Sequence, residues 1–279
     1  MDIEAYLRRI GFSGALRTDL DTLARLHRAH LRAVPYENLD VQLGRKVTIE
    51  LAPIYDKIVQ RGRGGWCYEM NGLFGWALQT LGFRVHRGAG AVMREVLGDV
   101  CVGNHLVLSV MLSEGSFLAD VGFGDGPIDP IRLIEGEFVS GRFTFGLERL
   151  DEKWLRLRNH TAGGAKSFDF TLDVADETLL AERCAFLQTA DVSPFVQNLV
   201  CQRYLANGEL VILRGRVLRH LDGTNVKERL IADEREFMRV LEDEFLLDVP
   251  EVASLWSRIC ARHDALFGDV PSLSVAGTA

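Results

Sequence analysis

The chain has 279 residues, a length that predicts two or three domains. Hydrophobic residues make up 47% and charged residues 25% of the sequence, which is typical of globular proteins and excludes wholesale disorder. The net charge of −7 and the lack of any Lys/Arg block argue against nucleic acid or an anionic membrane as a partner.

The first residues, MDIEAYLRR, lack the apolar core of a signal peptide, and no apolar run reaches the length of a bilayer span. We therefore expect a cytoplasmic protein. The five cysteines are odd in number, widely spaced and without a CxxC pair, so we expect reduced thiols rather than a disulfide framework, and no metal site. Self-association is left open by the sequence.

Residues 1–84 are predicted to form a helical bundle. Apolar side chains recur at helical spacing in four stretches, at 3–10, 20–34, 53–61 and 67–82. Pro35 ends the second helix and Gly82 caps the end of the fourth.

From residue 85 the pattern changes to β-branched and aromatic runs punctuated by Gly, Ser and Asp. The runs are HLVLSVML, SFLADVGF, RFTFGLERL, KWLRLRN and FDFTLDV. Strand-like segments at this spacing predict an antiparallel sheet or barrel over about 85–175.

The last part of the chain is predicted to be mixed. We expect helices at 176–192, within 194–206 and at 233–266, a strand hairpin at 209–214 and 216–221, and a loosely held tail, PSLSVAGTA.

The segment RGRGGWCYEMNG, residues 61–72, carries the strongest chemical signal. Gly64 and Gly65 give the backbone freedom just before a helix that begins near Cys67. The unpaired N–H groups and the positive dipole end at a helix start favour an anion, which lowers the pKa of a thiol. Cys67 is thus a candidate nucleophile, and its backbone N–H is a candidate oxyanion donor. The alternative is a small buried apolar residue.

A thiol nucleophile needs a base and a residue that orients the base. His105 opens an apolar strand and Asp120 lies in another, so each needs a polar partner if buried. A tight hairpin centred on Glu114 and Gly115 would place Asp120 four residues from the position facing His105, roughly 13 Å along the strand. Spacing alone therefore leaves the triad open.

The motifs RGGWCYEMNG, GNHLVL and LADVGFGDGP, in this order, resemble those of the arylamine N-acetyltransferases. HLRAVPYENLDV at 30–41 and SPFVQNLVCQR at 193–203 resemble two further segments of that family, so that the resemblance spans roughly 1–205. It implies an α+β fold of three domains with a cysteine-protease-like catalytic core. These would be a helical bundle at 1–84, an antiparallel β-barrel at 85–190 and an α/β lid at 191–279.

The resemblance also implies the roles of the site residues. Cys67 would be the nucleophile, His105 the base and Asp120 the orienting acid. Cys67 would take an acetyl group from acetyl-CoA, a donor substrate rather than a tightly bound cofactor. It would then pass the group to an arylamine, arylhydroxylamine or hydrazine. The oxyanion would be held by the N–H of Cys67 and by one near Val102 or Gly103.

The binding residues follow less directly. Gly103, Gly124 and Gly126 are candidate CoA-binding residues, because glycines can present N–H groups to phosphate; the alternative is plain turn geometry. The candidate walls of an aromatic pocket are Tyr36, Val92, Phe123 and Phe195, although each could simply belong to the core.

Arg63 and Glu69 flank Cys67 and are predicted to brace its loop as an ion pair, the alternative being that Arg63 aids ionisation of the thiol. Two rival functions remain. A thiol hydrolase or transglutaminase-like acyl transferase would use the same triad. A non-catalytic scaffold would not need all three residues.

Overall fold

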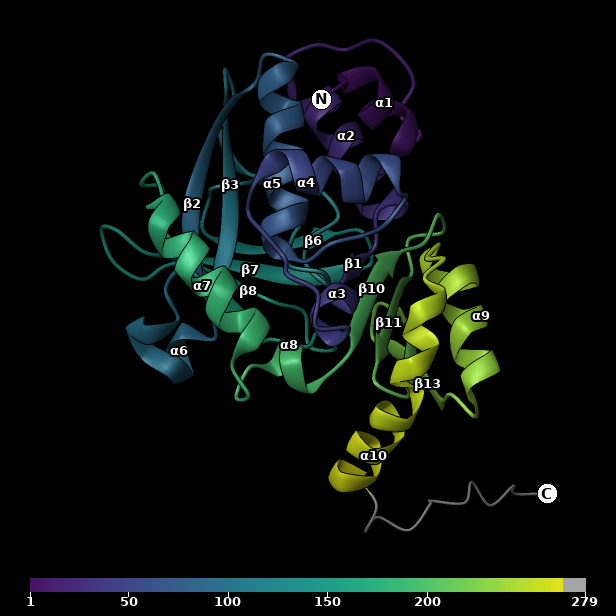
Figure 1. The fold of residues 1–279 in the computed structure, drawn as a ribbon. Coiled ribbons are helices and arrows are strands. Elements are labelled where there is room, and N and C mark those ends of the chain that lie inside the picture. Colours follow the sequence, from purple (N-terminus) through teal and green to yellow (C-terminus); the bar gives the residue numbers. More distant parts are fainter. Residues whose placement is uncertain (268–279) are drawn as a thin grey trace, which may run out of the picture.

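A computed structural model describes residues 1–267 of the chain, and the tail predicted at 271–279 to be loosely held lies outside them. The described residues form N-terminal helices, a curled antiparallel sheet and a second antiparallel sheet flanked by helices (Figure 1). The predicted α+β class is therefore confirmed.

Four N-terminal helices lie where the apolar periodicity predicts them, and a fifth, α3 (Leu39–Gln42), does not. The four are α1 (Ile3–Arg9), α2 (Leu20–Ala33), α4 (Leu51–Tyr55) and α5 (Cys67–Thr80). The side chains of Asp2 and Asp19 cap α1 and α2 by accepting backbone N–H bonds. Two details were not predicted: the short helix α3, and a π-helical turn, η1 (Asp56–Gln60), that continues α4.

The first sheet has eight strands in the described residues. In spatial order they are β5 (Ile131–Arg132), β4 (Gly115–Leu118), β3 (His105–Leu112), β2 (Arg84–Val92), β9 (Ser167–Phe170), β8 (Leu155–Arg158), β7 (Phe143–Arg149) and β6 (Gly136–Ser140). Neighbouring strands are antiparallel, and within residues 1–267 the edge strands β5 and β6 do not pair. The sheet is therefore a curled half-barrel. The β2–β3 connection holds α6 (Arg94–Leu97) and the 3₁₀ turn η2 (Gly98–Cys101).

The β3–β4 hairpin corrects the register expected from the sequence. Ser109 pairs with Leu118 and Leu112 with Gly115, so the turn is one residue nearer the N-terminus than expected. The strand also ends at Leu118, and Asp120 lies in the loop that follows instead of in a strand. Extended by two residues, the observed register would place Asp120 opposite Val107, on the same face as His105 and only two residues from it.

In the part of the chain that the structure describes, the second sheet contains one strand from the N-terminal part of the chain and four from the C-terminal part. Its strands, in spatial order, are β1 (Tyr36–Glu37), β10 (Val200–Tyr204), β11 (Leu210–Arg214), β12 (Val217–Asp222) and β13 (Asn225–Leu230). The C-terminal part of the chain also contains the helices α7 (Glu177–Thr189), α8 (Pro194–Gln197), α9 (Glu234–Phe245) and α10 (Trp256–Phe267), with the 3₁₀ turn η3 (Pro250–Leu255) before α10. Of these, α9 and α10 pack on the second sheet.

The expected helix within 194–206 is wrong beyond its first turn. Only α8 is helical, because Val200 to Tyr204 form β10, which pairs with β1 on one side and β11 on the other. The partner strand β1 comes from far along the chain, so local periodicity could not reveal it. Since β1 lies within residues 1–84, the helical part and the C-terminal part share one sheet, and the three-domain division stays a prediction.

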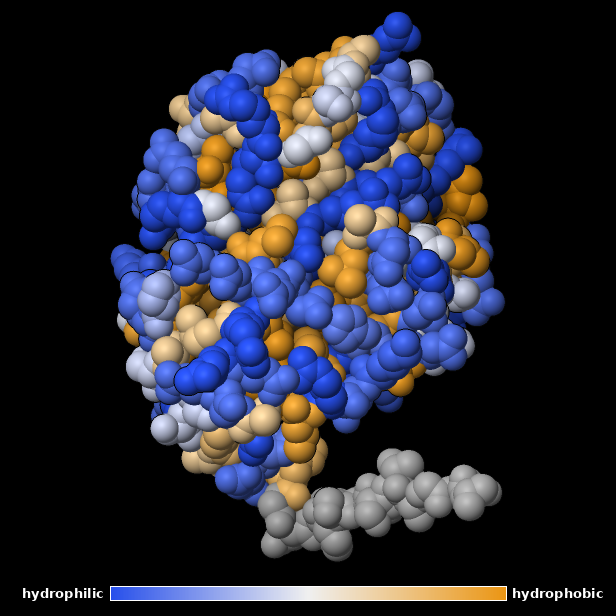
Figure 2. Space-filling model, turned by 90° about the vertical axis from the view of Figure 1, so that its right-hand side faces the viewer, coloured by the Kyte–Doolittle hydropathy of each residue, from blue (hydrophilic) through white to orange (hydrophobic). Residues whose placement is uncertain are grey.

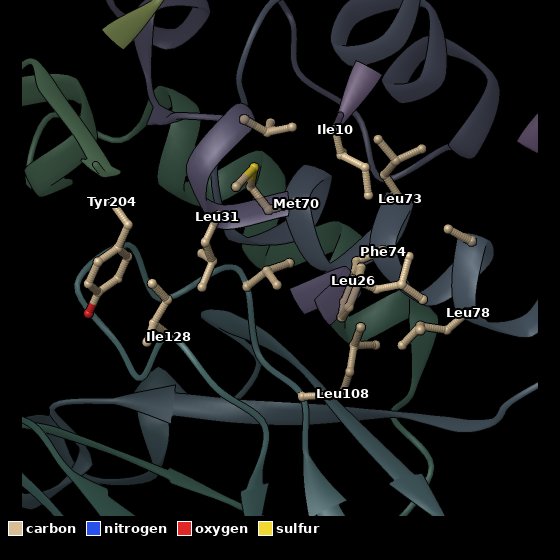
Figure 3. Close-up of a cluster of buried hydrophobic side chains, with 14 of the residues drawn as sticks. Ile10, Leu26, Leu31, Met70, Leu73, Phe74, Leu78, Leu108, Ile128 and Tyr204 are labelled. Atoms are coloured by element: carbon tan, nitrogen blue, oxygen red, sulfur yellow. The ribbon is translucent and has the colours of Figure 1, made fainter. Parts of the chain in front are cut away.

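The largest apolar core lies between the N-terminal helices and the first sheet. Figure 3 shows Leu26 of α2 and Phe74 and Leu78 of α5 packed toward Leu108 of β3, and all four are almost fully buried. This contact fixes α5, whose first residue is Cys67, against the strand that begins with His105.

Polar residues cover most of the face drawn in Figure 2, with apolar ones scattered between them. Among residues 1–267, the helices are too short or too polar to cross a bilayer.

His30 of α2 provides a test of this core. It is fully buried beside Phe74, with its Nδ1 2.9 Å from the hydroxyl of Tyr6. Burial, with a smaller contribution from the positive charge of Arg9, lowers the pKa of His30 to about 3. Between that pH and the ordinary histidine pKa of about 6.5, the unfolded chain binds a proton that the folded chain does not. Acid therefore favours unfolding.

We expect the free energy of unfolding of His30→Asn, which places an amide that does not titrate near Tyr6, to depend less on pH in acid than that of the wild type. The free energy of unfolding of the wild type minus that of His30→Asn should fall by about 1.4 kcal/mol per pH unit as the pH falls from about 6 to 4. Urea titrations of both proteins across this range measure it. A difference that does not change with pH would contradict the buried, neutral state of His30.

Candidate active site

The two glycines before Cys67 are required by close packing. A Cβ on Gly64 would lie 2.1 Å from the backbone oxygen of Pro35, and one on Gly65 would lie 2.7 Å from Cβ of Glu69. The backbone of Gly65 donates to Pro35 and accepts from Glu37, so the loop runs alongside β1. This close approach places Cys67 at the first position of α5, as the sequence predicts.

Arg63 and Glu69 brace this loop, but they do not pair with each other. Arg63 donates to Glu37 at 2.7 Å. Lys57, a buried residue of the π-helical turn η1, lies 2.9 Å from Glu69 and 2.9 Å from Asp40. Glu69 also accepts the backbone N–H of Trp66. Burial raises the pKa of Glu69 to about 7, although the charge of Lys57 opposes this. The predicted structural role thus involves a buried network of five charged residues.

His105 and Asp120 are brought into contact by the end of β4. Nε2 of His105 lies 2.6 Å from Oδ2 of Asp120, and both side chains are buried. The other carboxylate oxygen, Oδ1, accepts from Nδ2 of Asn71 at 2.7 Å and from the backbone N–H of Gly122 at 2.7 Å. The pairing left open by the sequence is therefore possible because Asp120 has left the strand ladder.

The carboxylate of Asp120 remains charged despite its burial. Burial by itself would raise its pKa, but the charge of His105 and the bonds from His105, Asn71 and Gly122 outweigh this effect. The pKa of Asp120 is accordingly held below its ordinary value. A charged acceptor at Nε2 fixes the tautomer of the ring and leaves Nδ1 as the nitrogen available to a second partner.

The sulfur of Cys67 lies against the backbone on both sides of His105. Its Sγ is 3.8 Å from the carbonyl oxygen of Asn104, and the backbone N–H of Leu106 interacts with it. Cys67 is 3% exposed, and burial raises the pKa of its thiol well above the ordinary value. The expectation that the helix start alone lowers this pKa is therefore wrong, since desolvation outweighs the nearby N–H groups.

Two of the predicted aromatic residues lie close to the catalytic candidates. Phe123 packs on the ring of His105, with centroids 5.8 Å apart, and Phe195 packs on Trp66, the neighbour of Cys67, at 5.3 Å. Tyr36 belongs to the same buried cluster as Cys67, and Val92 contacts the cluster around Phe168. Phe168 was not predicted, yet its ring lies 5.0 Å from that of His105.

The predicted CoA-binding glycines have packing reasons of their own. Gly103 has a positive φ of 86° and lies against Leu179 of α7, while a Cβ on Gly124 would overlap the side chain of Gln202. The carbonyl of Gly126 accepts from Tyr204. The contact of these glycines with CoA stays a prediction.

The second oxyanion donor expected near residues 102 and 103 is wrong. The N–H of Val102 donates to Asp99 and that of Gly103 donates to Gly90, so both are already used inside the protein. The N–H of Cys67 differs, because the first residue of a helix has no carbonyl one turn earlier to bind.

Asn71 is the residue that the sequence analysis missed. Its side chain donates to Asp120 and to the carbonyl of Leu106, and its oxygen accepts the N–H of Val121. It lies four residues after Cys67 on α5, and this spacing puts both on one helix face. A search of the sequence for polar residues one helical turn from the nucleophile could have identified Asn71.

Residues 1–267 contain no cluster of His, Cys, Asp and Glu side chains arranged to hold a metal ion.

A family model described as N-acetyltransferase matches residues 19–253 of the chain. A pineal gland arylamine N-acetyltransferase isozyme of Gallus gallus is 33% identical over 273 residues, covering 88% of this chain and 93% of the relative. Arylamine N-acetyltransferase 1 of Oryctolagus cuniculus is 29% identical over 293 residues, covering 96% and 99%. The structure of Mycobacterium marinum arylamine N-acetyltransferase in complex with CoA has a TM-score of 0.84 at 31% identity, covering 95% and 99%.

Gly122 tests how closely the acid and the nucleophile are packed. A Cβ there would lie 2.6 Å from Nδ2 of Asn71 and 2.9 Å from Cα of Cys67, so the backbone would have to shift. We expect Gly122→Ala to lower the free energy of unfolding in urea by about 1–3 kcal/mol, the usual cost of overpacking.

Gly164→Ala is the matched control, because its nearest atom, Oδ2 of Asp125, would be 3.5 Å away, an ordinary contact. Equal effects of the two substitutions would show that the close packing around Gly122 is not real.

Proposed function

The chain belongs to the arylamine N-acetyltransferase family, and from this membership we propose that Cys67, His105 and Asp120 are the residues that carry out its acetyl transfer. The hydrogen bond of 2.6 Å between Nε2 of His105 and the charged carboxylate of Asp120 is the observation that carries the proposal. As an acyltransferase, the protein needs an activated nucleophile that can hold an acyl group between two substrates.

Cys67 is ionised by passing its proton to His105. Its burial raises the thiol pKa, so a thiolate cannot form there by losing a proton to water. The proton moves instead to Nδ1 of His105, since Nε2 already faces Asp120. The resulting imidazolium lies between the thiolate and the carboxylate, and both negative charges stabilise it.

The first half-reaction makes an acetyl-enzyme. The thiolate of Cys67 attacks the carbonyl carbon of acetyl-CoA, the negative charge moves to the carbonyl oxygen, and the N–H of Cys67 at the start of α5 stabilises it. As the oxyanion collapses, the C–S bond to CoA breaks, and His105 returns its proton to the CoA thiolate. A thioester of Cys67 remains.

The second half-reaction regenerates the thiol. The nitrogen of an arylamine, arylhydroxylamine or hydrazine attacks the thioester while Nδ1 of His105 takes its proton. The C–S bond to Cys67 breaks, and the proton goes to the leaving thiolate. The two halves proceed in turn at one sulfur, so the kinetics are ping-pong.

The identity of the two substrates is supported by similarity and by the walls of the site. The Mycobacterium marinum relative is known as a complex with CoA, which supports acetyl-CoA as the donor here. Phe123 against His105 and Phe195 against Trp66 supply flat apolar surface, Tyr36 belongs to the cluster of Cys67, and Val92 adds apolar surface in the cluster of Phe123, which together suit an aromatic acceptor.

A thiol hydrolase with the same triad is the second candidate. Cys67 is 3% exposed, however, and aromatic or apolar side chains surround it. Such a site keeps water away from the thioester, and this favours transfer to an amine over transfer to water.

We expect incubation of the wild type with acetyl-CoA to add one acetyl group to Cys67, and Cys67→Ala to abolish the addition. Intact-mass spectrometry followed by peptide mapping measures both. Cys201→Ala, which removes another buried thiol in the second sheet, is the matched control and should still be acetylated. A folded, reduced wild type that stays unmodified would contradict the proposal.

The fate of the acetyl group separates the two candidate functions. After excess donor is removed, an arylamine should discharge the acetyl-enzyme at least about tenfold faster than buffer alone, because the amine is held against the thioester. The decay of the acetylated mass with time measures this ratio. Equal decay with and without arylamine would favour the hydrolase.

A further inference from the structure

His27 of α2 lies against the loop that carries Asp120, here called the acid loop (119–130). Its side chain is 1% exposed, and its Nδ1 lies 2.9 Å from the backbone oxygen of Ile128, near the end of the loop. The next residue, Arg28, forms an ion pair with Asp129. Two consecutive residues of α2 thus hold the far end of the acid loop.

The hydrogen bond to Ile128 defines the state of the ring. A carbonyl oxygen only accepts, so Nδ1 of His27 must carry the hydrogen. Burial lowers the pKa of His27, and the ring is neutral at ordinary pH, although the carbonyls of Ile128 and Asp120 and the charge of Asp129 act in the opposite direction. His27 is therefore a neutral donor to the far end of the acid loop.

The near end of the loop is held from another helix. Asn71 of α5 binds the carboxylate of Asp120 and the backbone of Val121. Phe74, three residues further along α5, packs edge-on against the ring of His27, with centroids 5.7 Å apart. The two helices are in contact through this pair, so the two ends of the loop are held by one rigid unit.

The loop itself has little stiffness of its own. Gly122, Gly124 and Gly126 lie between its two ends, and glycine restricts the backbone least. The direction of the carboxylate toward His105 therefore depends on the contacts that other elements make with the loop, at its two ends and at Gly126, whose carbonyl accepts from Tyr204.

We propose that His27 is a positioning residue for acetyl transfer, which keeps Asp120 in register with His105 by donating to the backbone of Ile128. This inference rests on the proposed function, because it assumes that Asp120 orients the base. Without the bond, the carbonyl of Ile128 would be buried and unpaired, and the loop would shift to satisfy it.

The test compares two amides at the same position. In His27→Asn the amide nitrogen takes the place of Nδ1 and donates to Ile128, whereas in His27→Gln it takes the place of Nε2 and does not. We measure the single-turnover rate constant for acetylation of Cys67 by acetyl-CoA, together with the amplitude, which counts the folded active sites. His30→Gln is the control, since His30 is equally buried on α2 but faces Tyr6.

We expect His27→Gln to lower the rate constant at least about tenfold, as misplaced catalytic groups do, with His27→Asn close to the wild type. The acetyl-CoA concentration that gives half of the maximal single-turnover rate should not change, because His27 does not touch the substrate. His30→Gln should lower the amplitude or the stability but leave the rate constant unchanged.

A purely structural role would lower amplitudes and leave all rate constants alike, which overturns the inference. It is also overturned if His27→Asn is as slow as His27→Gln. If His27→Gln does not fold, His27→Asn decides: a rate constant like that of the wild type supports the inference and a tenfold loss overturns it. A wild type that takes up no acetyl group contradicts the proposed function itself, and the inference with it.

Discussion

Asp120 is a carboxylate almost without water around it, and it stays charged there because three N–H groups donate to its two oxygens. His105 binds one oxygen, and Asn71 and the backbone of Gly122 bind the other. Burial by itself favours the protonated acid, which cannot stabilise an imidazolium, and these donors together outweigh it. The chemistry proposed for Cys67 depends on this charge, because the buried thiol has no other route to ionisation.

The fold supplies the residues of the site from separate parts of the chain. Helix α5 contributes both Cys67 and Asn71, strand β3 contributes His105, and the loop after β4 contributes Asp120. The apolar core between α5 and β3 sets the position of Cys67 relative to His105. Because β4 ends at Leu118, Asp120 is free of the strand ladder. Close packing at Gly122 then holds the loop that carries Asp120 against Asn71 and Cys67.

The sequence predicts the helices and most strands of the first sheet well, because their apolar periodicity is local. It also predicts Cys67 at a helix start, since two consecutive glycines are unfavourable inside a helix and therefore mark the loop before it. The partnership of His105 and Asp120 could not be derived from spacing, because a shift of one residue in the turn and the end of β4 decide it. The strand β10 was missed for a related reason: its partner β1 is distant in the chain.

Chemical properties were harder to predict than positions. The thiol pKa of Cys67 was expected to fall, but burial raises it, and burial is a property of the whole fold. The oxyanion donors expected at Val102 and Gly103 are used in local turns that the motif does not reveal. Asn71 stood inside the recognised motif, yet its function depends on the backbone of Leu106 and Val121, which only the packed structure brings near.

The ionisation of Cys67 by His105 is measured most directly by the rate of alkylation with iodoacetamide as a function of pH. A thiolate held in an ion pair should react at neutral pH with a rate that changes little between about pH 7 and 9. In His105→Gln the rate at neutral pH should fall and then rise steeply as the solution becomes alkaline. Identical profiles for the two proteins would contradict the proton transfer on which the proposed mechanism rests.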